Sequence, residues 1–322
     1  MRAHDPEAIA GRILATTPAG ARRTRPVALG RIDAERQFLP AEYTQLFYSP
    51  LWCDLDRRHR LRYAQLYALR TNEVIMLFER FLVHAILPPM ARRLKAKRLP
   101  VLRQLLLEML REEVEHDAAF AALNRASRPD IYQKAEFFFF PPSVGLRSLI
   151  AAMGLSARRL AHPLWLLFFI EESSLALARD LAAIGDDHGL GPPEPNWLAV
   201  HQEHTHDERR HTLIDRLLFE QCYANRGRFA RRIDAWMFER ILEAILLPSP
   251  NGAGVRVVDQ LARDYPELAS LRPTMVREVV AVGRNPAFRA SLLSRRLAPR
   301  AWKLFHRCPE LNLLADWIPG YA

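Results

Sequence analysis

His201-Gln-Glu-His-Thr-His-Asp-Glu-Arg-Arg-His211 is the most informative segment of this 322-residue chain. Glu208 and His211 are three residues apart, and His204 precedes Glu208 by four residues. On an α-helix these spacings put the three side chains on one face, and His201, one heptad before Glu208, falls on that face as well. The segment therefore predicts a helix that presents metal-binding groups to one side.

A second Glu-x-x-His motif lies upstream, at Glu113 and His116. A helix predicted from Leu99 to Asn124 would place both residues on a stripe with Leu106 and Phe120. Two Glu-x-x-His helices, each preceded by a helix with a carboxylate in its apolar face, form the ligand set of a di-iron or di-manganese four-helix bundle. One such motif is common on solvated helices, but two on apolar stripes indicate a metal site, because buried carboxylates require cations beside them.

The third carboxylate is expected from a helix that runs from Asp56 to Leu87 and is ended by Pro88-Pro89. Glu79 lies in its almost wholly apolar face and is the preferred ligand. Glu73 shares its face with arginines and is the alternative.

The fourth carboxylate is expected from a helix over Pro163 to Ile184. Glu171 aligns with the apolar stripe of this helix and is preferred to its neighbour Glu172. Glu113 and Glu208 can bridge two metals, and mixed carboxylate and imidazole donors without thiolate favour iron or manganese over structural zinc. The predicted metal ligands are Glu79, Glu113, His116, Glu171, His204, Glu208 and His211.

Three further residues are expected to support these ligands. Glu112 and Asp207 each precede a ligand glutamate, and such carboxylates can accept the free ring N–H of a ligand histidine across the core. Ion pairing of Glu112 and Asp207 with arginines on the helix surface is the alternative. His201 is expected to contact the ligands or to line a pocket.

The composition predicts an all-α protein, because the long apolar segments are rich in Leu, Ala, Arg and Glu while glycine is sparse. Residues 1–45 are interpreted as an N-terminal arm and residues 46–322 as one domain, with the bundle at about 56–224 and further helices at 225–322. Asn196 is the expected cap of the fourth bundle helix, which should reach Ala224. The helices expected after the bundle are Phe229 to Leu246, Ala253 to Asp264 and Thr274 to Val282.

The net charge of +10 is spread along the chain without a nucleic-acid-binding motif, which favours a solvated basic surface. The three cysteines are far apart and suit a reducing compartment. The N-terminus has no apolar signal segment, and the run Pro163 to Ile170 is too short to span a bilayer. We therefore expect a cytoplasmic protein that binds neither membrane nor nucleic acid.

Asp207-Glu-Arg-Arg-His211 and Glu112-Glu-Val-Glu-His116 resemble the motifs of non-haem di-iron oxygenases on the ferritin-like scaffold. With His204 as a third histidine, the segment from about 56 to 224 is similar to the p-aminobenzoate N-oxygenase family. This resemblance implies a ferritin-like bundle with two irons, O2 and an external reductant delivered by an electron donor. It also implies a homodimer, and a small-molecule amine that is oxidised to a hydroxylamine, nitroso or nitro compound in secondary metabolism.

Three alternatives remain at the level of the sequence. A di-iron C–H hydroxylase or desaturase would use the same ligands. A ferritin-like ferroxidase is disfavoured by the N-terminal arm and the C-terminal extension, since cage-forming subunits are compact. A helical interaction protein without metal is the third alternative.

Overall fold

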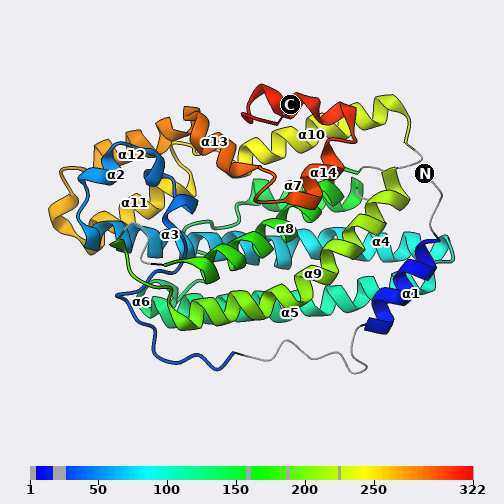
Figure 1. Ribbon diagram of the computed structural model, residues 1–322, viewed down its shortest axis with the longest axis horizontal. Coiled ribbons are helices and arrows are strands. Elements are labelled where there is room, and N and C mark those ends of the chain that lie inside the picture. The colour runs from blue at the N-terminus through cyan, green and yellow to red at the C-terminus, as the bar shows by residue number, and fades with distance from the viewer. Residues whose placement is uncertain (1–4, 17–26, 157–160, 186–188, 224–225, 322) are drawn as a thin grey trace.

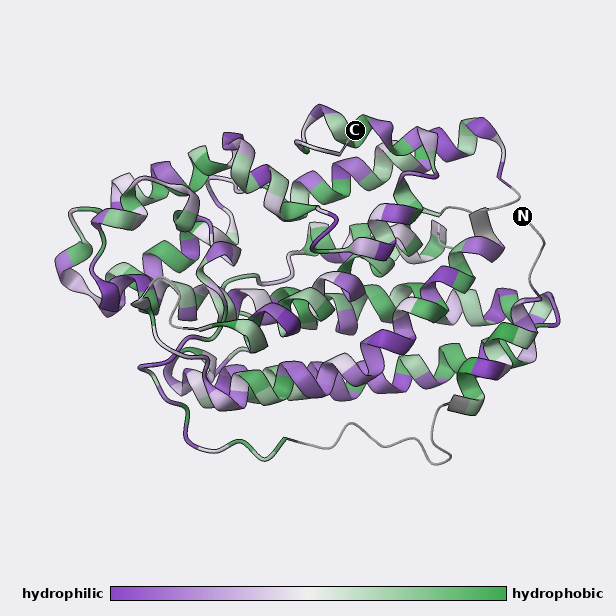
Figure 2. Ribbon diagram, viewed as in Figure 1, coloured by the Kyte–Doolittle hydropathy of each residue, from purple (hydrophilic) through white to green (hydrophobic). Residues whose placement is uncertain are grey.

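The computed structural model describes residues 5–16, 27–156, 161–185, 189–223 and 226–321. Helices dominate the described residues, where the only strand-like pairing is an isolated bridge between Gln37 and Pro193. This confirms the all-α prediction. Figure 2 shows hydrophobic and hydrophilic residues alternating along most helices, as expected for amphipathic helices around a shared core.

Four long helical segments form the central bundle (Figure 1). α8 packs along α9, and α5 packs against both α9 and α3. The segments α5 and α8 are joined by a long connection that contains α6 (Pro129–Tyr132) and α7 (Val144–Ser156), which is the kind of crossover found in ferritin-like bundles. The bundle segments are α3–η3–α4 (Arg57–Leu77, Phe78–Val83, His84–Ala96), α5 (Pro100–Ser127), α8 (His162–Ala183) and α9 (Pro195–Tyr223).

The first bundle segment does not end at Pro88-Pro89, so that prediction is wrong. The helix continues through both prolines to Ala96, because Leu87, Met90 and their neighbours are buried on its inner face. Pro89 leaves the carbonyl of Ala85 without its helical donor. Gly154 of α7 packs against this carbonyl, and a Cβ at Gly154 would lie only 2.5 Å from the Ala85 oxygen.

Residues Phe78–Val83 form a π-helical turn inside this segment. A π-helix has i→i+5 hydrogen bonds, so it inserts an extra residue per turn and changes the direction of the side chains that follow. Phe78 and Glu79 open this turn and are both buried. The sequence pattern of this segment predicts a regular α-helix, so the π-helical turn differs from the prediction.

The fourth bundle helix begins at Pro195, and its cap differs from the predicted one. The Glu194 carboxylate, not Asn196, accepts the backbone N–H of Trp197, at 2.9 Å. The Asn196 side chain instead accepts the backbone N–H of Gly30, at 2.8 Å. Asn196 therefore fastens the N-terminal arm to the start of α9.

The N-terminal arm carries a short helix, α1 (Pro6–Thr16), which packs on α5 and buries Ala10 and Ile13. Residues 17–26 of this arm lie outside the described residues. Near residue 45 the chain forms three short elements, namely η1 (Ala41–Tyr43), η2 (Leu46–Tyr48) and α2 (Leu51–Asp54).

The C-terminal part adds a second layer of helices (Figure 1). α10 and α14 pack on α8, and α11 packs on α3, so these helices cover the outer face of the bundle. Their bounds are α10 (Arg228–Leu246), α11 (Ala253–Asp264), η5 (Pro266–Leu268), α12 (Arg272–Ala281), η6 (Val282–Arg284), α13 (Pro286–Leu292), α14 (Pro299–Phe305) and η7 (Pro309–Asp316).

One helical segment in the described part of the chain, Arg57–Ala96, is long and apolar enough to cross a membrane by length and composition. However, 61% of its apolar window is buried inside the fold. Its most interior positions also include the carboxylates Glu73 and Glu79. The segment therefore has the burial of a core helix of the bundle.

Candidate metal centre

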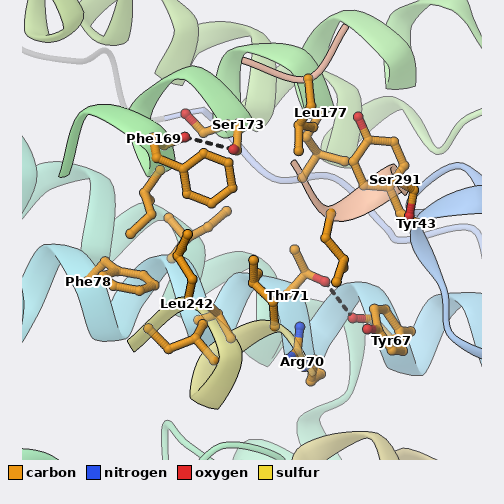
Figure 3. A pocket seen from close by; sticks show the side chains of 18 of the residues that line it. Tyr43, Tyr67, Arg70, Thr71, Phe78, Phe169, Ser173, Leu177, Leu242 and Ser291 are labelled. Carbon is orange, nitrogen blue, oxygen red and sulfur yellow. Dashed lines mark hydrogen bonds between the residues drawn. The ribbon is translucent and has the colours of Figure 1, made fainter. Parts of the chain in front are cut away.

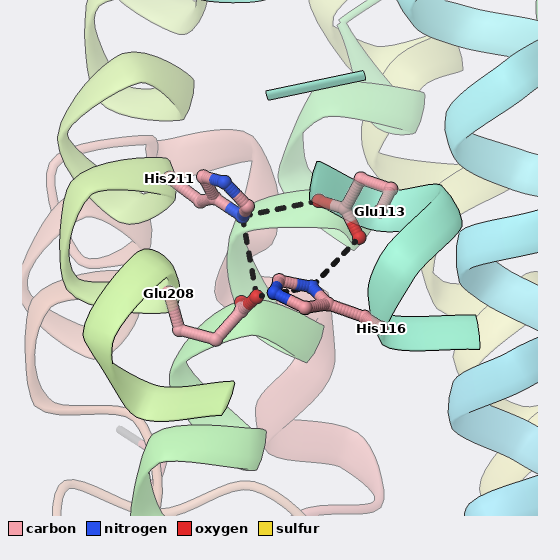
Figure 4. Close-up of side chains that lie close together, drawn as sticks. All are labelled: Glu113, His116, Glu208 and His211. Atoms are coloured by element: carbon pink, nitrogen blue, oxygen red, sulfur yellow. Dashed lines mark ion pairs between the residues drawn. The ribbon is translucent and has the colours of Figure 1, made fainter. Parts of the chain in front are cut away.

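Glu113 and His116 of α5 meet Glu208 and His211 of α9 at the centre of the bundle (Figure 4). Each residue offers a ligand atom, these atoms all lie within 4.8 Å of one another, and all four side chains are buried. The spacing of three residues within each pair brings glutamate and histidine to the same helix face. The two Glu-x-x-His motifs thus converge on one point.

The two histidines direct Nδ1 toward both carboxylates. His211 Nδ1 lies 3.1 Å from Glu113 and 3.2 Å from Glu208, and His116 Nδ1 lies 3.4 Å from Glu208. Neither Nδ1 atom makes a hydrogen bond within the described residues, and neither does either oxygen of Glu208. Buried polar atoms normally have partners, so these unpaired donor atoms indicate a site shaped for a cation.

The opposite ring nitrogens are held by a second pair of carboxylates. His211 Nε2 lies 2.9 Å from Glu112, and His116 Nε2 lies 3.3 Å from Asp207. Arg210, which the sequence analysis does not single out, contacts Glu112 at 2.5 Å and Asp207 at 3.1 Å. A proton held on Nε2 by these carboxylates leaves the Nδ1 lone pair of each ring free to bind a metal.

Glu79 and His204 form a second group with His116. His204 Nε2 lies 3.2 Å from Glu79 and 3.0 Å from Glu208, so Glu208 adjoins both groups. Both oxygens of Glu79 and both ring nitrogens of His204 lack hydrogen bonds to described residues. The two groups therefore offer adjacent positions for two cations.

Glu171 of α8 faces the same centre, with its carboxylate 3.9 Å from His211 Nδ1. It also lines a small cavity of about 20 Å³ together with Glu79, Glu113, His204 and Glu208. The structure therefore brings all seven residues that the sequence predicts as metal ligands to one place.

The two alternative glutamates have other partners. Glu73 accepts the Tyr132 hydroxyl at 2.6 Å and the backbone N–H groups of the aromatic segment Phe138–Phe140. Glu172 accepts the backbone N–H groups of Arg300 and Ala301, at the start of α14. Each of these carboxylates thus holds a connecting segment against the bundle.

His201 does not join the cluster. Its ring stacks on Trp197, with centroids 5.9 Å apart, and contacts Phe120 at 5.2 Å. Phe120 also contacts His204 at 5.0 Å, so its ring lies against both histidines. Burial lowers the pKa of His201 to about 4.

Asp215 is a buried carboxylate that the sequence analysis does not single out. It lies four residues after His211 on the same stripe of α9, and neither of its oxygens makes a hydrogen bond to a described residue. Burial raises its pKa well above the usual range of an aspartate, because the charged form is poorly solvated there. Its i+4 spacing from His211 is the signal that could have identified it.

The charges of the cluster are strongly perturbed. Burial opposes the charged form of His116, but Asp207, Glu113 and Glu208 outweigh it and raise the pKa of this ring to about 10. Burial, reinforced by Glu113 and Glu208, raises the pKa of Glu79 well above its usual range. Carboxylates crowded in this way are stable as anions only beside added positive charge, so the residues fit a pair of bound metal ions.

The comparisons with known proteins agree with this geometry. The family model of p-aminobenzoate N-oxygenase AurF matches residues 25–254, which is more than two thirds of the chain and includes every residue of the cluster. A search of curated proteins gives no match. The AurF family implies a centre of two metal ions, and the buried histidine and glutamate groups described above could hold them. The chain belongs to the AurF family of p-aminobenzoate N-oxygenases.

Proposed function

We propose that this protein is a non-haem di-iron monooxygenase that uses O2 to oxygenate the nitrogen of an amine. The observation that carries the proposal is the convergence of seven buried carboxylate and imidazole side chains, with unpaired donor atoms, in a chain of the AurF family. The absence of thiolate among these donors favours iron, with manganese as the alternative metal. Bound iron would supply the activation of O2 once an external electron donor has reduced it.

Each side chain has a distinct proposed task at this centre. Glu113 and Glu208 face both histidine rings of the first group and are suited to bridging two metals. His116 and His211 would each bind one metal through Nδ1, while Glu112 and Asp207 orient the rings from behind. Glu79, Glu171 and His204 would complete the coordination.

A cavity of about 190 Å³ beside the bundle is the proposed binding pocket for the amine (Figure 3). Ile75, Phe78, Ile170 and Ser174 line both this cavity and the small one at the metal centre, so a bound substrate would lie next to the cluster. The volume suffices for one aromatic ring, because an apolar cavity of about 150 Å³ binds benzene. Its apolar walls would also exclude water from the reacting nitrogen.

Arg70 is the proposed anchor for a carboxylate on the substrate. It lines the pocket, where its guanidinium lies 5.2 Å from the Tyr67 ring, and its buried Nε makes no hydrogen bond to a described residue (Figure 3). The described residues also include no carboxylate that forms an ion pair with Arg70. A guanidinium of this kind can bind a carboxylate with two parallel hydrogen bonds, which supports an amine that carries a carboxylate.

Product analysis tests the proposed reaction. The iron-loaded protein is incubated with aminobenzoates, a chemical reductant and ¹⁸O2, and the products are identified by mass spectrometry. The expected products carry ¹⁸O on nitrogen, as hydroxylamine, nitroso or nitro compounds. An unchanged nitrogen with a new labelled C–OH group would contradict N-oxygenation and favour the hydroxylase, and oxidation of Fe(II) with every tested amine unchanged would favour a ferroxidase.

A further inference from the structure

A second cavity of about 90 Å³ adjoins the proposed substrate pocket and has a different character. We call it the apolar annex. It lies between α7, α10 and the first bundle segment, and each of its lining side chains is apolar. These residues are Val74, Leu77, Phe78, Leu82, Phe140, Leu146, Leu149, Ile150, Met153, Leu166, Ile241, Ala244 and Ile245.

The annex lies directly beside the substrate pocket. Val74, Phe78, Leu166 and Ile245 line both cavities, so no more than one layer of side chains lies between the two spaces. Phe78 also lines the small cavity at the metal centre, so among the described residues it alone lines all three cavities. Phe78 is the first residue of the π-helical turn, and this turn therefore sets the junction.

The two cavities differ in the groups that they offer. The substrate pocket carries polar side chains, including Arg70, Thr71 and Ser173, whereas the annex has none. Its wall from α7 includes Met153, a flexible side chain that adapts to varied shapes. An unfilled apolar cavity lowers the stability of a fold in proportion to its volume, so an apolar cavity directly beside the substrate pocket is better explained by an occupant than by packing.

The annex also reaches the surface. Ala244 of α10 is exposed, and the side chain of Leu149 of α7 is 40% exposed, although both line the annex. The seam between α7 and α10 therefore forms its outer rim. A substituent longer than the annex would leave through this seam and gain no further burial.

From these observations we infer that the substrate of this enzyme carries an extended apolar substituent, an alkyl chain or a second ring, which occupies the annex while the amine faces the metal centre. This inference rests on the proposed function, because it takes the substrate pocket and the metal centre as the binding site of the amine. The substrate is accordingly larger than a single aminobenzoate ring. A substituent of several carbon atoms fits the volume of the annex.

Binding of a homologous series tests the inference without turnover. The dissociation constants of aniline and of 4-alkylanilines from ethyl to octyl are measured by calorimetry on the metal-loaded protein, without reductant and O2. We expect the affinity to rise about fourfold for each added methylene, the ratio expected for burying a CH2 group, until the chain passes the rim. An affinity that does not change beyond the ethyl compound, or no binding of any aniline, would overturn the inference.

Two variants in the wall of the annex distinguish binding of the alkyl chain in the annex from nonspecific hydrophobic binding elsewhere on the protein. Ala244→Phe narrows the rim. In this variant the affinity should stop rising with chain length beyond the shortest alkyl chains, while the affinity for aniline stays unchanged. Met153→Ala enlarges the annex, so the affinity should keep rising up to longer alkyl chains than in the unaltered protein. Ala281→Phe adds the same ring to an exposed position of α12 that lines none of these cavities and should leave the series as in the unaltered protein. Identical series in all four proteins would overturn the inference.

The outcomes for the annex and for the proposed reaction are distinguishable. If the affinity rises with chain length as expected but no nitrogen is oxidised when reductant and O2 are added, the inference about the annex is supported and the N-oxygenase proposal fails. If aniline is oxidised on nitrogen but longer chains bind no better, the reaction stands and the annex inference fails.

Discussion

At the scale of single residues, the most informative comparison is between two histidines on one helix. His204 faces Glu79 and Glu208 from within the bundle, whereas His206, two residues later, is exposed. His204→Ala should lower the iron content and change the activity, because one metal would lose a ligand. His206→Ala is the matched control and should change neither. Elemental analysis and product formation measure the two effects. Equal iron content and activity in the two variants would show that His204 is an ordinary core residue and not a metal ligand.

The titration of the cluster predicts a pH dependence for the metal-free protein. The pKa of His116 is raised to about 10, above its value in the unfolded chain, and the pKa of Glu79 is also raised. The folded protein therefore binds more protons than the unfolded chain above about pH 6.5. Its free energy of unfolding should fall as the pH rises from about 6.5 to about 10.

Urea unfolding of the metal-free and the metal-loaded protein across this range measures the effect. The metal-loaded protein should show much less dependence, since bound metal replaces the protons on its ligands. Metal-free stability that stays constant or rises over the same range would contradict the electrostatic description of the cluster.

At the scale of elements, the first bundle segment presents two buried glutamates with opposite roles. Glu73 on α3 accepts hydrogen bonds from a hydroxyl and three backbone N–H groups, whereas Glu79 in the π-helical turn accepts none from the residues that the structure describes. Glu73→Ala should destabilise the protein by about 3 kcal/mol or more, because buried donors lose their acceptor, while the folded fraction keeps its iron.

Glu79→Gln should show the reverse pattern, with less bound iron and a metal-free protein that is more stable by on the order of 1 kcal/mol, because a neutral amide avoids the cost of placing an ionisable carboxyl group in this buried site. Thermal unfolding and iron analysis of both variants check the pair of predictions. Iron loss in Glu73→Ala with full iron in Glu79→Gln would exchange the roles of the two residues.

The same segment marks the limit of what the sequence predicts about elements. Apolar residues at helical spacing predict the bundle helices to within a few residues, as for α8 and α9. The helix that continues through Pro88-Pro89 packs against α7, and local sequence signals do not predict such a tertiary contact. The π-helical turn at Phe78–Val83 lies in a stretch whose sequence pattern is that of a regular α-helix, and no local signal identifies it.

At the scale of the whole molecule, sequence reasoning locates the candidate site because helical periodicity is a strong constraint. The spacing of Glu113, His116, Glu208 and His211 allows only one common face per helix, and the fold joins these faces. The partners that come from distant segments are different. Arg210 and the aromatic segment Phe138–Phe140 have roles that depend on long-range contacts, and residue spacing within one helix does not predict such contacts.

The proposed function requires two metal ions that are held by both Glu-x-x-His helices together. Elemental analysis of the purified, iron-reconstituted protein and of Glu208→Ala measures this most directly, with circular dichroism to verify that the variant is folded. We predict two irons per chain in the unaltered protein and a loss of di-iron binding in the folded variant. A protein that takes up no iron or manganese after reconstitution, or a variant that retains two irons, would contradict the account.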